Sequence, residues 1–105
     1  MVRQIKDKEE YDQVLAECGS KLVVIDFYAT WCGPCKMISP KVQEMAEAYA
    51  DVVFLKVDVD ESEELALEFN VNCMPTFILM KNGQRAAEFS GANAEKLREL
   101  IVQHK

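Results

Sequence analysis

Two thiols stand three positions apart in the segment Trp31 to Lys36, which reads WCGPCK. An apolar run at 22–28 precedes this segment and a helical pattern at 34–49 follows it, so we expect the thiols at the start of a helix. A helix start concentrates unpaired backbone N–H groups and the positive end of the helix dipole. Both stabilise a thiolate, which is the nucleophilic form of cysteine. A CxxC pair beside a βαβ pattern, in a chain without secretory features, predicts a site of dithiol–disulfide exchange.

The two thiols are expected to play different parts. Ideal helical positions i and i+3 hold their Cβ atoms about 5–6 Å apart, whereas a disulfide needs about 3.5–4.5 Å. We therefore expect Cys32 just before the helix and Cys35 in its first turn. Gly33 permits the close approach, and Pro34 suits the first helical position. We predict that Cys32 is exposed and attacks a partner disulfide, and that the sheltered Cys35 resolves the mixed disulfide.

The residues between the thiols, Gly33 and Pro34, carry no charge. A histidine there would favour the reduced thiolate and make the pair more oxidising, so its absence predicts a reductant. The alternative use of a CxxC pair is a zinc site, which needs a second pair of ligands. The remaining candidates, Cys18, Cys73 and His104, are scattered along the chain, and we therefore expect no metal.

Asp26 is the second candidate for chemistry, because it interrupts the apolar run from Leu22 to Tyr28. A buried carboxylate is unfavourable unless it is protonated or partnered. We expect its pKa to be raised, which suits a proton acceptor working near neutral pH. Our hypothesis is that Asp26 takes the Cys35 proton, through water, as Cys35 attacks the mixed disulfide. The alternative is a buried carboxylate that only satisfies the backbone or Lys56.

The patterning around these residues predicts alternating strands and helices. Strands are expected at 2–5, 22–28, 52–57, 76–80 and 84–89. Helices are expected after Asp7, at 34–49, after Asp60 or Ser62, and after Asn93. Asn82-Gly83 indicates a tight hairpin between the last two strands. Right-handed crossovers between parallel strands, followed by an antiparallel pair, give a mixed sheet with helices on both faces.

Composition restricts the class of protein. The 105 residues suffice for one domain with an ordinary core, and 50% hydrophobic with 29% charged residues fits a soluble globular protein. The formal net charge of -6 disfavours nucleic acid and anionic membrane surfaces as partners. No apolar stretch approaches the length of a membrane span. Residues 1–7 lack the apolar stretch of a signal peptide, so we expect a cytosolic protein, where structural disulfides are rare.

Four ordered motifs resemble the thioredoxin family: DFYATWCGPCK at 26–36, VDVD at 57–60, MPTF at 74–77 and FSGA at 89–92. The resemblance extends along essentially the whole chain and is closest to cytosolic animal-type thioredoxins. It implies a single domain over residues 1–105 with the thioredoxin fold, an α/β fold in which four helices flank a central five-stranded mixed sheet. It also implies a general protein-disulfide reductase, a dithiol electron carrier with no bound cofactor beyond the Cys32–Cys35 disulfide.

The resemblance implies partners as well. An NADPH-dependent thioredoxin reductase would recycle the oxidised form, and disulfide-containing proteins such as peroxiredoxins and ribonucleotide reductase would receive the electrons. The expected location is the cytoplasm, with entry into the nucleus left open. Two other functions stay open from the sequence alone: an oxidase or isomerase of the secretory pathway, and a redox-gated binding module that holds a partner without turnover.

By motif match, Cys32 is the nucleophile, Cys35 the resolving cysteine and Asp26 the buried base. Pro75 is similar to the family's cis-proline, beside which the backbone of Met74 can pair with an extended substrate segment. The resemblance places a shallow apolar contact surface at Trp31, Met74, Pro75, Gly91 and Ala92. A core position is the alternative for Trp31, because large aromatic side chains are usually well buried.

Four further residues are expected to tune the site: Gly33, Pro34, Lys36 and Lys56. Lys36 steers partners or eases thiolate formation, unless it is an ordinary solvated lysine. Lys56 resembles the lysine that some thioredoxins place near the buried carboxylate, and a snorkelling lysine is the alternative.

Cys73 lies next to the expected contact surface, where it is open to oxidation, nitrosylation or bridging of two chains; an idle thiol is the alternative. Cys18 lies on the apolar face of a helix and is expected in the core. Many animal-type thioredoxins carry further cysteines in the third helix, where this chain has Ser62 and Phe69. We therefore expect no second intramolecular disulfide, and a monomer with a Cys73-linked dimer as the alternative.

Overall fold

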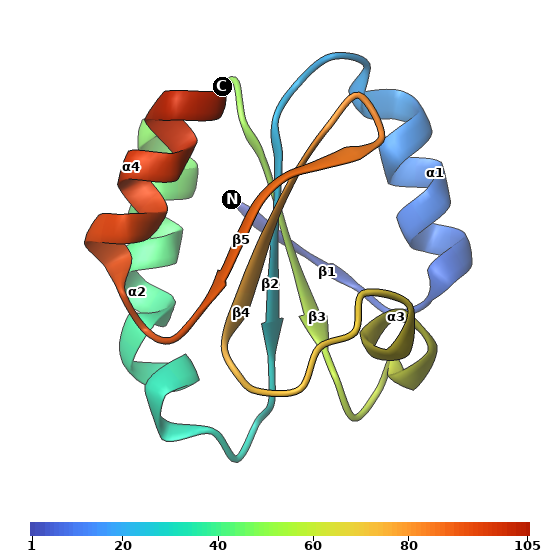
Figure 1. The fold of residues 1–105 in the computed structure, drawn as a ribbon, viewed down its shortest axis with the longest axis vertical. Coiled ribbons are helices and arrows are strands. Elements are labelled where there is room, and N and C mark those ends of the chain that lie inside the picture. Colours follow the sequence, from blue (N-terminus) through green and yellow to red (C-terminus); the bar gives the residue numbers. More distant parts are fainter.

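A five-stranded sheet in the order β1-β3-β2-β4-β5 forms the centre of the computed structural model, which describes residues 1–105 (Figure 1). The strands are β1 (Val2–Ile5), β2 (Val23–Tyr28), β3 (Val53–Asp58), β4 (Thr76–Lys81) and β5 (Gln84–Ser90). Strand β3 pairs in parallel with β1 and β2, whereas β4 pairs antiparallel with β2 and β5. The sheet is therefore mixed, and the order of elements along the chain confirms the sequence prediction.

Four helices cover the two faces of this sheet: α1 (Lys8–Cys18), α2 (Gly33–Ala48), α3 (Glu63–Glu68) and α4 (Ala94–His104). Figure 1 shows α1 and α3 on one side of the strands and α2 and α4 on the other. Each side has its own apolar cluster: α1 and α3 pack with Ile25 and Phe27, whereas α2 and α4 pack with Val24 and Phe77. The alternation of side chains along β2 thus supplies both layers of the core, as expected for a strand covered on both faces.

Local sequence sets where the elements begin and end. The side chains of Asp7 and Asn93 accept hydrogen bonds from the backbone N–H groups of residues three positions on, which caps α1 and α4. Asn82 and Gly83 both have positive φ, as the tight turn between β4 and β5 requires. Ser62 precedes α3, but its side chain makes no cap hydrogen bond; its hydroxyl donates instead to the backbone oxygen of Lys6 and ties α3 to the end of β1.

The topology brings distant segments to one edge of the sheet. The parallel strands β2 and β3 both end there, and the loop after β2 leads directly into α2. Because β4 runs antiparallel to β2, it begins at this same edge, and β5 ends there. The segments at 29–32, 73–75 and 91–92 are therefore neighbours although up to 63 positions separate them in the chain. This edge carries the candidate active site.

Candidate active site

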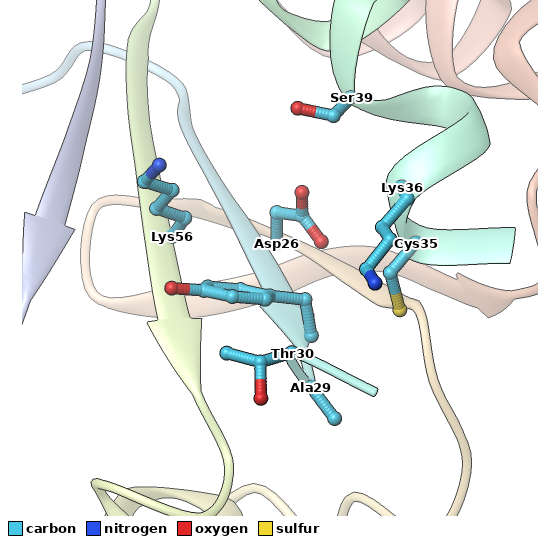
Figure 2. A pocket seen from close by; sticks show the side chains of 8 residues that line it. Asp26, Ala29, Thr30, Cys35, Lys36, Ser39 and Lys56 are labelled. Carbon is cyan, nitrogen blue, oxygen red and sulfur yellow. The ribbon is translucent and has the colours of Figure 1, made fainter. Parts of the chain in front are cut away.

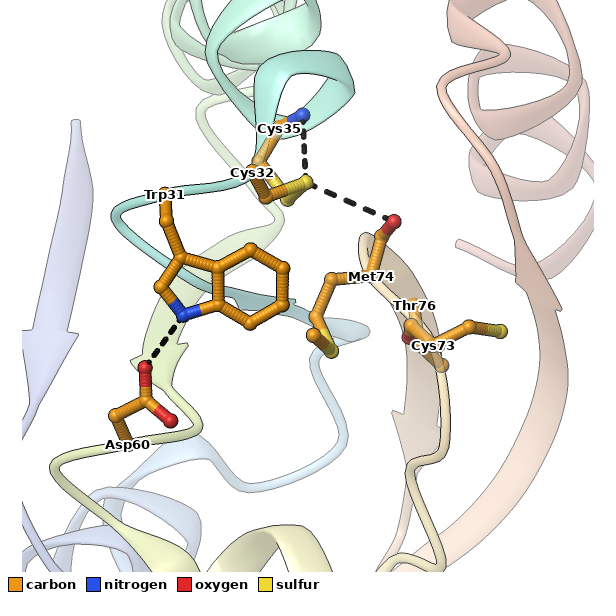
Figure 3. The surroundings of a disulfide bond; sticks show 7 residues. All are labelled: Trp31, Cys32, Cys35, Asp60, Cys73, Met74 and Thr76. Atoms are coloured by element: carbon orange, nitrogen blue, oxygen red, sulfur yellow. Dashed lines mark hydrogen bonds between the residues drawn. A yellow bond between two sulfur atoms is a disulfide. The ribbon is translucent and has the colours of Figure 1, made fainter.

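The start of α2 holds the two thiols in the arrangement that the sequence predicts. Cys32 is the N-cap residue with extended backbone, Cys35 lies in the first turn, and the two form a disulfide with their Cα atoms 5.3 Å apart. The backbone N–H of Cys35 donates to Cys32 Sγ at 3.2 Å (Figure 3). This N–H is one of the donors that a helix start leaves unpaired, so it favours negative charge on Cys32 Sγ once the disulfide is reduced.

Cys32 is less accessible than predicted. Only 6% of its surface is exposed, the same fraction as for Cys35, so the prediction of an exposed attacking thiol is wrong for this disulfide form. The cause is the loop before β4, whose Met74 carbonyl oxygen lies 3.7 Å from Cys32 Sγ (Figure 3). Ala29 belongs to the same small apolar cluster as the two cysteines, and Met74 packs against this cluster. Gly33 and Pro34, which lie between the two cysteines, are exposed.

Trp31 lies beside the dithiol with 67% of its surface exposed, which excludes the alternative of a core tryptophan. Its indole Nε1–H donates to Asp60 Oδ2 at 2.9 Å (Figure 3). Asp60 comes from the turn after β3, and the local sequence marks it only as a candidate helix cap. The hydrogen bond fixes the orientation of a large exposed ring next to the reactive sulfurs.

The Met74–Pro75 peptide bond is cis, as the resemblance implies, and Pro75 is buried while Met74 is half-buried. The backbone N–H of Gly91 donates to the Pro75 carbonyl oxygen at 2.9 Å, which joins this loop to the end of β5. Gly91 has φ of 104°, a conformation that favours glycine. The structure thus brings Gly91 and the exposed Ala92 beside the Met74–Pro75 loop.

Asp26 is buried in the middle of β2, with 8% of its surface exposed, and its Oδ1 atom has no hydrogen-bond partner. Burial raises the pKa of Asp26 to about 7, against the opposing charge of Lys56. This confirms the expectation of a raised pKa. A carboxyl that served only to satisfy neighbouring polar groups would have both oxygens paired, so the unpaired Oδ1 weighs against the purely structural alternative.

A cavity of about 270 Å³ connects Asp26 with the dithiol. Its wall is formed by Asp26, Tyr28, Ala29, Thr30, Cys35, Lys36, Ser39 and Lys56. Figure 2 shows the Asp26 carboxyl between Lys56 on β3 and Cys35 on α2. A water molecule occupies about 30 Å³ in the liquid, so the cavity has room for a water-mediated path between the Cys35 sulfur and the carboxyl.

The remaining predicted residues fall into two groups. Lys36 is exposed and Lys56 is half-buried, and both line the cavity at Asp26. Cys73 is an exposed free thiol; Cys18 is buried, its Sγ–H donates to the Val14 carbonyl oxygen, and burial raises its pKa. No second disulfide forms in the chain, as expected.

Two further observations concern possible ligands and membranes. No three histidine, cysteine, aspartate or glutamate side chains gather where they could coordinate a metal ion. No helix combines the length and apolar character needed to cross a bilayer.

A disulfide formed across the first turn of a helix, at the edge of a mixed sheet and beside a cis-proline loop, defines a thiol–disulfide oxidoreductase that carries electrons as a dithiol. Comparison with known proteins supports this class. The Thioredoxin family model matches residues 2–103, and the chain belongs to the thioredoxin family. It is 54% identical over 101 residues to the thioredoxins of Ovis aries and Homo sapiens, with 96% of each chain covered.

Solved structures give the same result for the fold. The X-ray structure of Fasciola hepatica thioredoxin superposes with a TM-score of 0.97 at 45% sequence identity, covering 98% of this chain and 99% of that one. Reduced Schistosoma mansoni thioredoxin pre-protein gives a TM-score of 0.95 at 42% identity, covering 99% and 98% respectively. These similarities confirm the predicted family and the predicted architecture of four helices around a five-stranded mixed sheet.

Proposed function

We propose that this protein works as a general protein-disulfide reductase, with residues 1–105 acting as one thioredoxin domain and Cys32 as the nucleophile. The observation that carries this assignment is the backbone N–H of Cys35, which points at Cys32 Sγ from the start of α2. Of the two sulfurs, only Cys32 precedes the helix, so the helix dipole acts most directly on its negative charge. The uncharged Gly33–Pro34 link supports the reducing direction.

The reaction transfers two electrons in two exchanges of sulfur bonds. The Cys32 thiolate attacks one sulfur of a partner disulfide, and a mixed disulfide forms as the first partner thiolate leaves. Cys35 then loses its proton and attacks Cys32 Sγ, which forms the Cys32–Cys35 disulfide and releases the second partner thiolate. The partner is reduced by two electrons, the dithiol is oxidised by two, and the departing thiolates take up protons.

Asp26 accepts the Cys35 proton in the second exchange. With a pKa raised to about 7, the carboxylate is a stronger base than an ordinary one, and a substantial share of it is still ionised near neutral pH. The shared cavity supports a path through water rather than direct contact. The proton then leaves to solvent or to the departing thiolate.

Partner proteins dock on a shallow surface made of Trp31, Met74, Pro75, Gly91 and Ala92. Trp31 offers an exposed ring that Asp60 holds in place, and the loop at Met74 offers an extended backbone next to Cys32. Backbone pairing with an extended segment tolerates many sequences, which suits a reductase of broad partner range. Lys36, exposed beside this surface, assists thiolate formation or approach.

The electron supply follows from membership of the family. An NADPH-dependent thioredoxin reductase reduces the Cys32–Cys35 disulfide, and peroxiredoxins and ribonucleotide reductase are among the acceptors. No prosthetic group is needed, because the two sulfurs hold both electrons. The protein acts as a monomer in the cytoplasm, and exposed Cys73 is a regulatory thiol that links two chains under oxidation.

Insulin reduction by dithiothreitol tests the direction and generality of the activity. The protein should accelerate insulin precipitation, and Cys32→Ser should abolish the acceleration while Cys18→Ser, a change at the buried thiol of α1, leaves it intact. Cys35→Ser should accumulate mixed disulfides on Cys32 in a cell lysate. If insulin does not precipitate faster although both active-site thiols are intact, a redox-gated binding module is favoured instead. The absence of Cys32-linked adducts in the lysate would refute the assignment of the nucleophile.

A further inference from the structure

Three polar side chains lie in register across three neighbouring strands. Gln4 on β1 pairs with Lys56 on β3, and Lys56 pairs with Asp26 on β2. Because in-register residues of parallel strands project to the same side of a sheet, all three point toward the layer of α2. The row therefore runs from the exposed Gln4 on the outer strand β1, through Lys56 on β3, to the buried Asp26 on β2.

Tyr28 spans this row. It follows Asp26 by two positions on β2 and so shares its face of the sheet. Its hydroxyl donates to Gln4 Oε1 at 2.9 Å, although β3 separates β2 from β1. The tyrosine side chain thus crosses β3 at the position of Lys56, whose Nζ lies 5.9 Å from the centre of the ring. An ammonium within about 6 Å of an aromatic face is attracted to it.

The position of the Lys56 ammonium matters because it opposes the effect of burial on Asp26. Burial raises the pKa of the carboxyl, and the positive charge of Lys56 lowers it. Cys35 and Lys36 of α2 face the same cavity. Burial raises the pKa of the Tyr28 hydroxyl, the hydrogen bond to Gln4 lowers it, and the carboxylates of Asp58, Glu61 and Asp26 raise it further. Lys56 is the cation whose charge lowers the pKa of Asp26, so a freely moving Lys56 side chain would weaken that effect.

We propose that Gln4 and Tyr28 are positioning residues for the transfer of the proton from Cys35 to Asp26, because together they fix the Lys56 ammonium beside the carboxyl. Gln4 orients the Tyr28 ring through its hydroxyl, and the ring limits the positions that the lysine chain can adopt. The inference rests on the proposed role of Asp26 as the base. Neither residue touches the reacting sulfurs, which distinguishes them from catalytic residues.

The test measures the Asp26 carboxyl directly, by ¹³C NMR titration of the oxidised protein, in which neither active-site thiol titrates. In Tyr28→Leu, the pKa of Asp26 should rise by up to about half a unit, because the energy of one cation–π contact limits how firmly the ring can hold the ammonium. Gln4→Met and Tyr28→Phe, which remove only the hydrogen bond, should give smaller rises. Tyr49→Leu is the matched control: Tyr49 is also half-buried and holds a lysine ammonium, that of Lys105, over its ring at the far end of α2. It should leave the pKa of Asp26 unchanged.

A second series separates positioning of the lysine from exclusion of water by the ring. In a Lys56→Met background, Tyr28→Leu should no longer raise the pKa of Asp26. An equal rise in both backgrounds, or no rise in either, would overturn the inference. In single-turnover resolution of a mixed disulfide, the pH midpoint of the rate should move upward together with the pKa of Asp26 measured by NMR. A rate midpoint that stays fixed would also overturn the inference. The role of Asp26 as the base is tested separately. It would be refuted if Asp26→Asn left the rate and the pH profile of that resolution step unchanged.

Discussion

Replacing Asp26 by asparagine should make the protein more stable at alkaline pH, with a gain that disappears in acid. The pKa of Asp26 is raised by burial from 3.8 to about 7. Between these two values the folded chain binds one proton that the unfolded chain has released, so the free energy of unfolding falls as pH rises. Three pKa units correspond to about 4 kcal/mol. Because only 8% of Asp26 is exposed, solvent screens little of this effect.

That energy is a large share of the roughly 5–15 kcal/mol that stabilises a typical domain. Asparagine has nearly the same shape and carries no charge at any pH. The unfolding free energy of Asp26→Asn minus that of the parent should therefore increase by about 4 kcal/mol from about pH 4 to about pH 8. Any hydrogen bonds that the asparagine amide makes or lacks add a contribution that does not vary with pH. The slope of the stability difference against pH therefore reports the titration of the Asp26 carboxyl alone.

Urea unfolding of the oxidised proteins, followed by far-UV circular dichroism across that pH range, measures the slope. The oxidised form keeps Cys32 and Cys35 from titrating. Asp51→Asn, a change at an exposed aspartate beyond the end of α2, supplies the control for the loss of one surface charge. A stability difference that is constant with pH would show that Asp26 titrates alike in the folded and unfolded chains, and the proposed proton acceptor would lose its physical basis.

Three further results are expected. Trp31→Ala should lower kcat/KM for protein disulfides about tenfold, as for a central contact residue, but should barely change the reaction with a small aromatic disulfide; equal losses on both would refute a docking role. Peroxide should produce a disulfide-linked dimer on non-reducing gels, and Cys73→Ser should abolish it while insulin reduction stays at the parent rate; a persisting dimer would exclude this thiol. Asn93→Ala should lower the unfolding free energy by about 1 kcal/mol in urea, through loss of the α4 cap, with no effect on turnover.

The sequence predicted most of the fold because each element carries its own local signals. The apolar run at 22–28, the Asn82-Gly83 turn and the caps at Asp7 and Asn93 each act within a few residues, and each appears in the structure. The relative placement of Cys32 and Cys35 was predictable for the same reason, since it depends on the geometry of one helix turn.

The contacts that the sequence did not predict all join residues far apart in the chain. Cys32 is covered by Met74, which lies 42 positions away, so its low exposure follows from topology. The hydrogen bonds from Trp31 to Asp60 and from Tyr28 to Gln4 span 29 and 24 positions. Gln4 stands in no motif, and the VDVD motif at 57–60 supports the family resemblance without indicating that Asp60 contacts Trp31. They become visible only once the strand order brings their neighbours together.

The proposed reaction requires that the Cys32 sulfur ionises easily and the Cys35 sulfur does not. The rate of alkylation of each cysteine in the reduced protein, followed by mass spectrometry as a function of pH, tests it most directly. Cys32 should react first, with a midpoint well below the value of about 8.5 for a free cysteine, while Cys35 stays unmodified. A Cys32 that reacts only near that ordinary value, or more slowly than Cys35, would contradict the account.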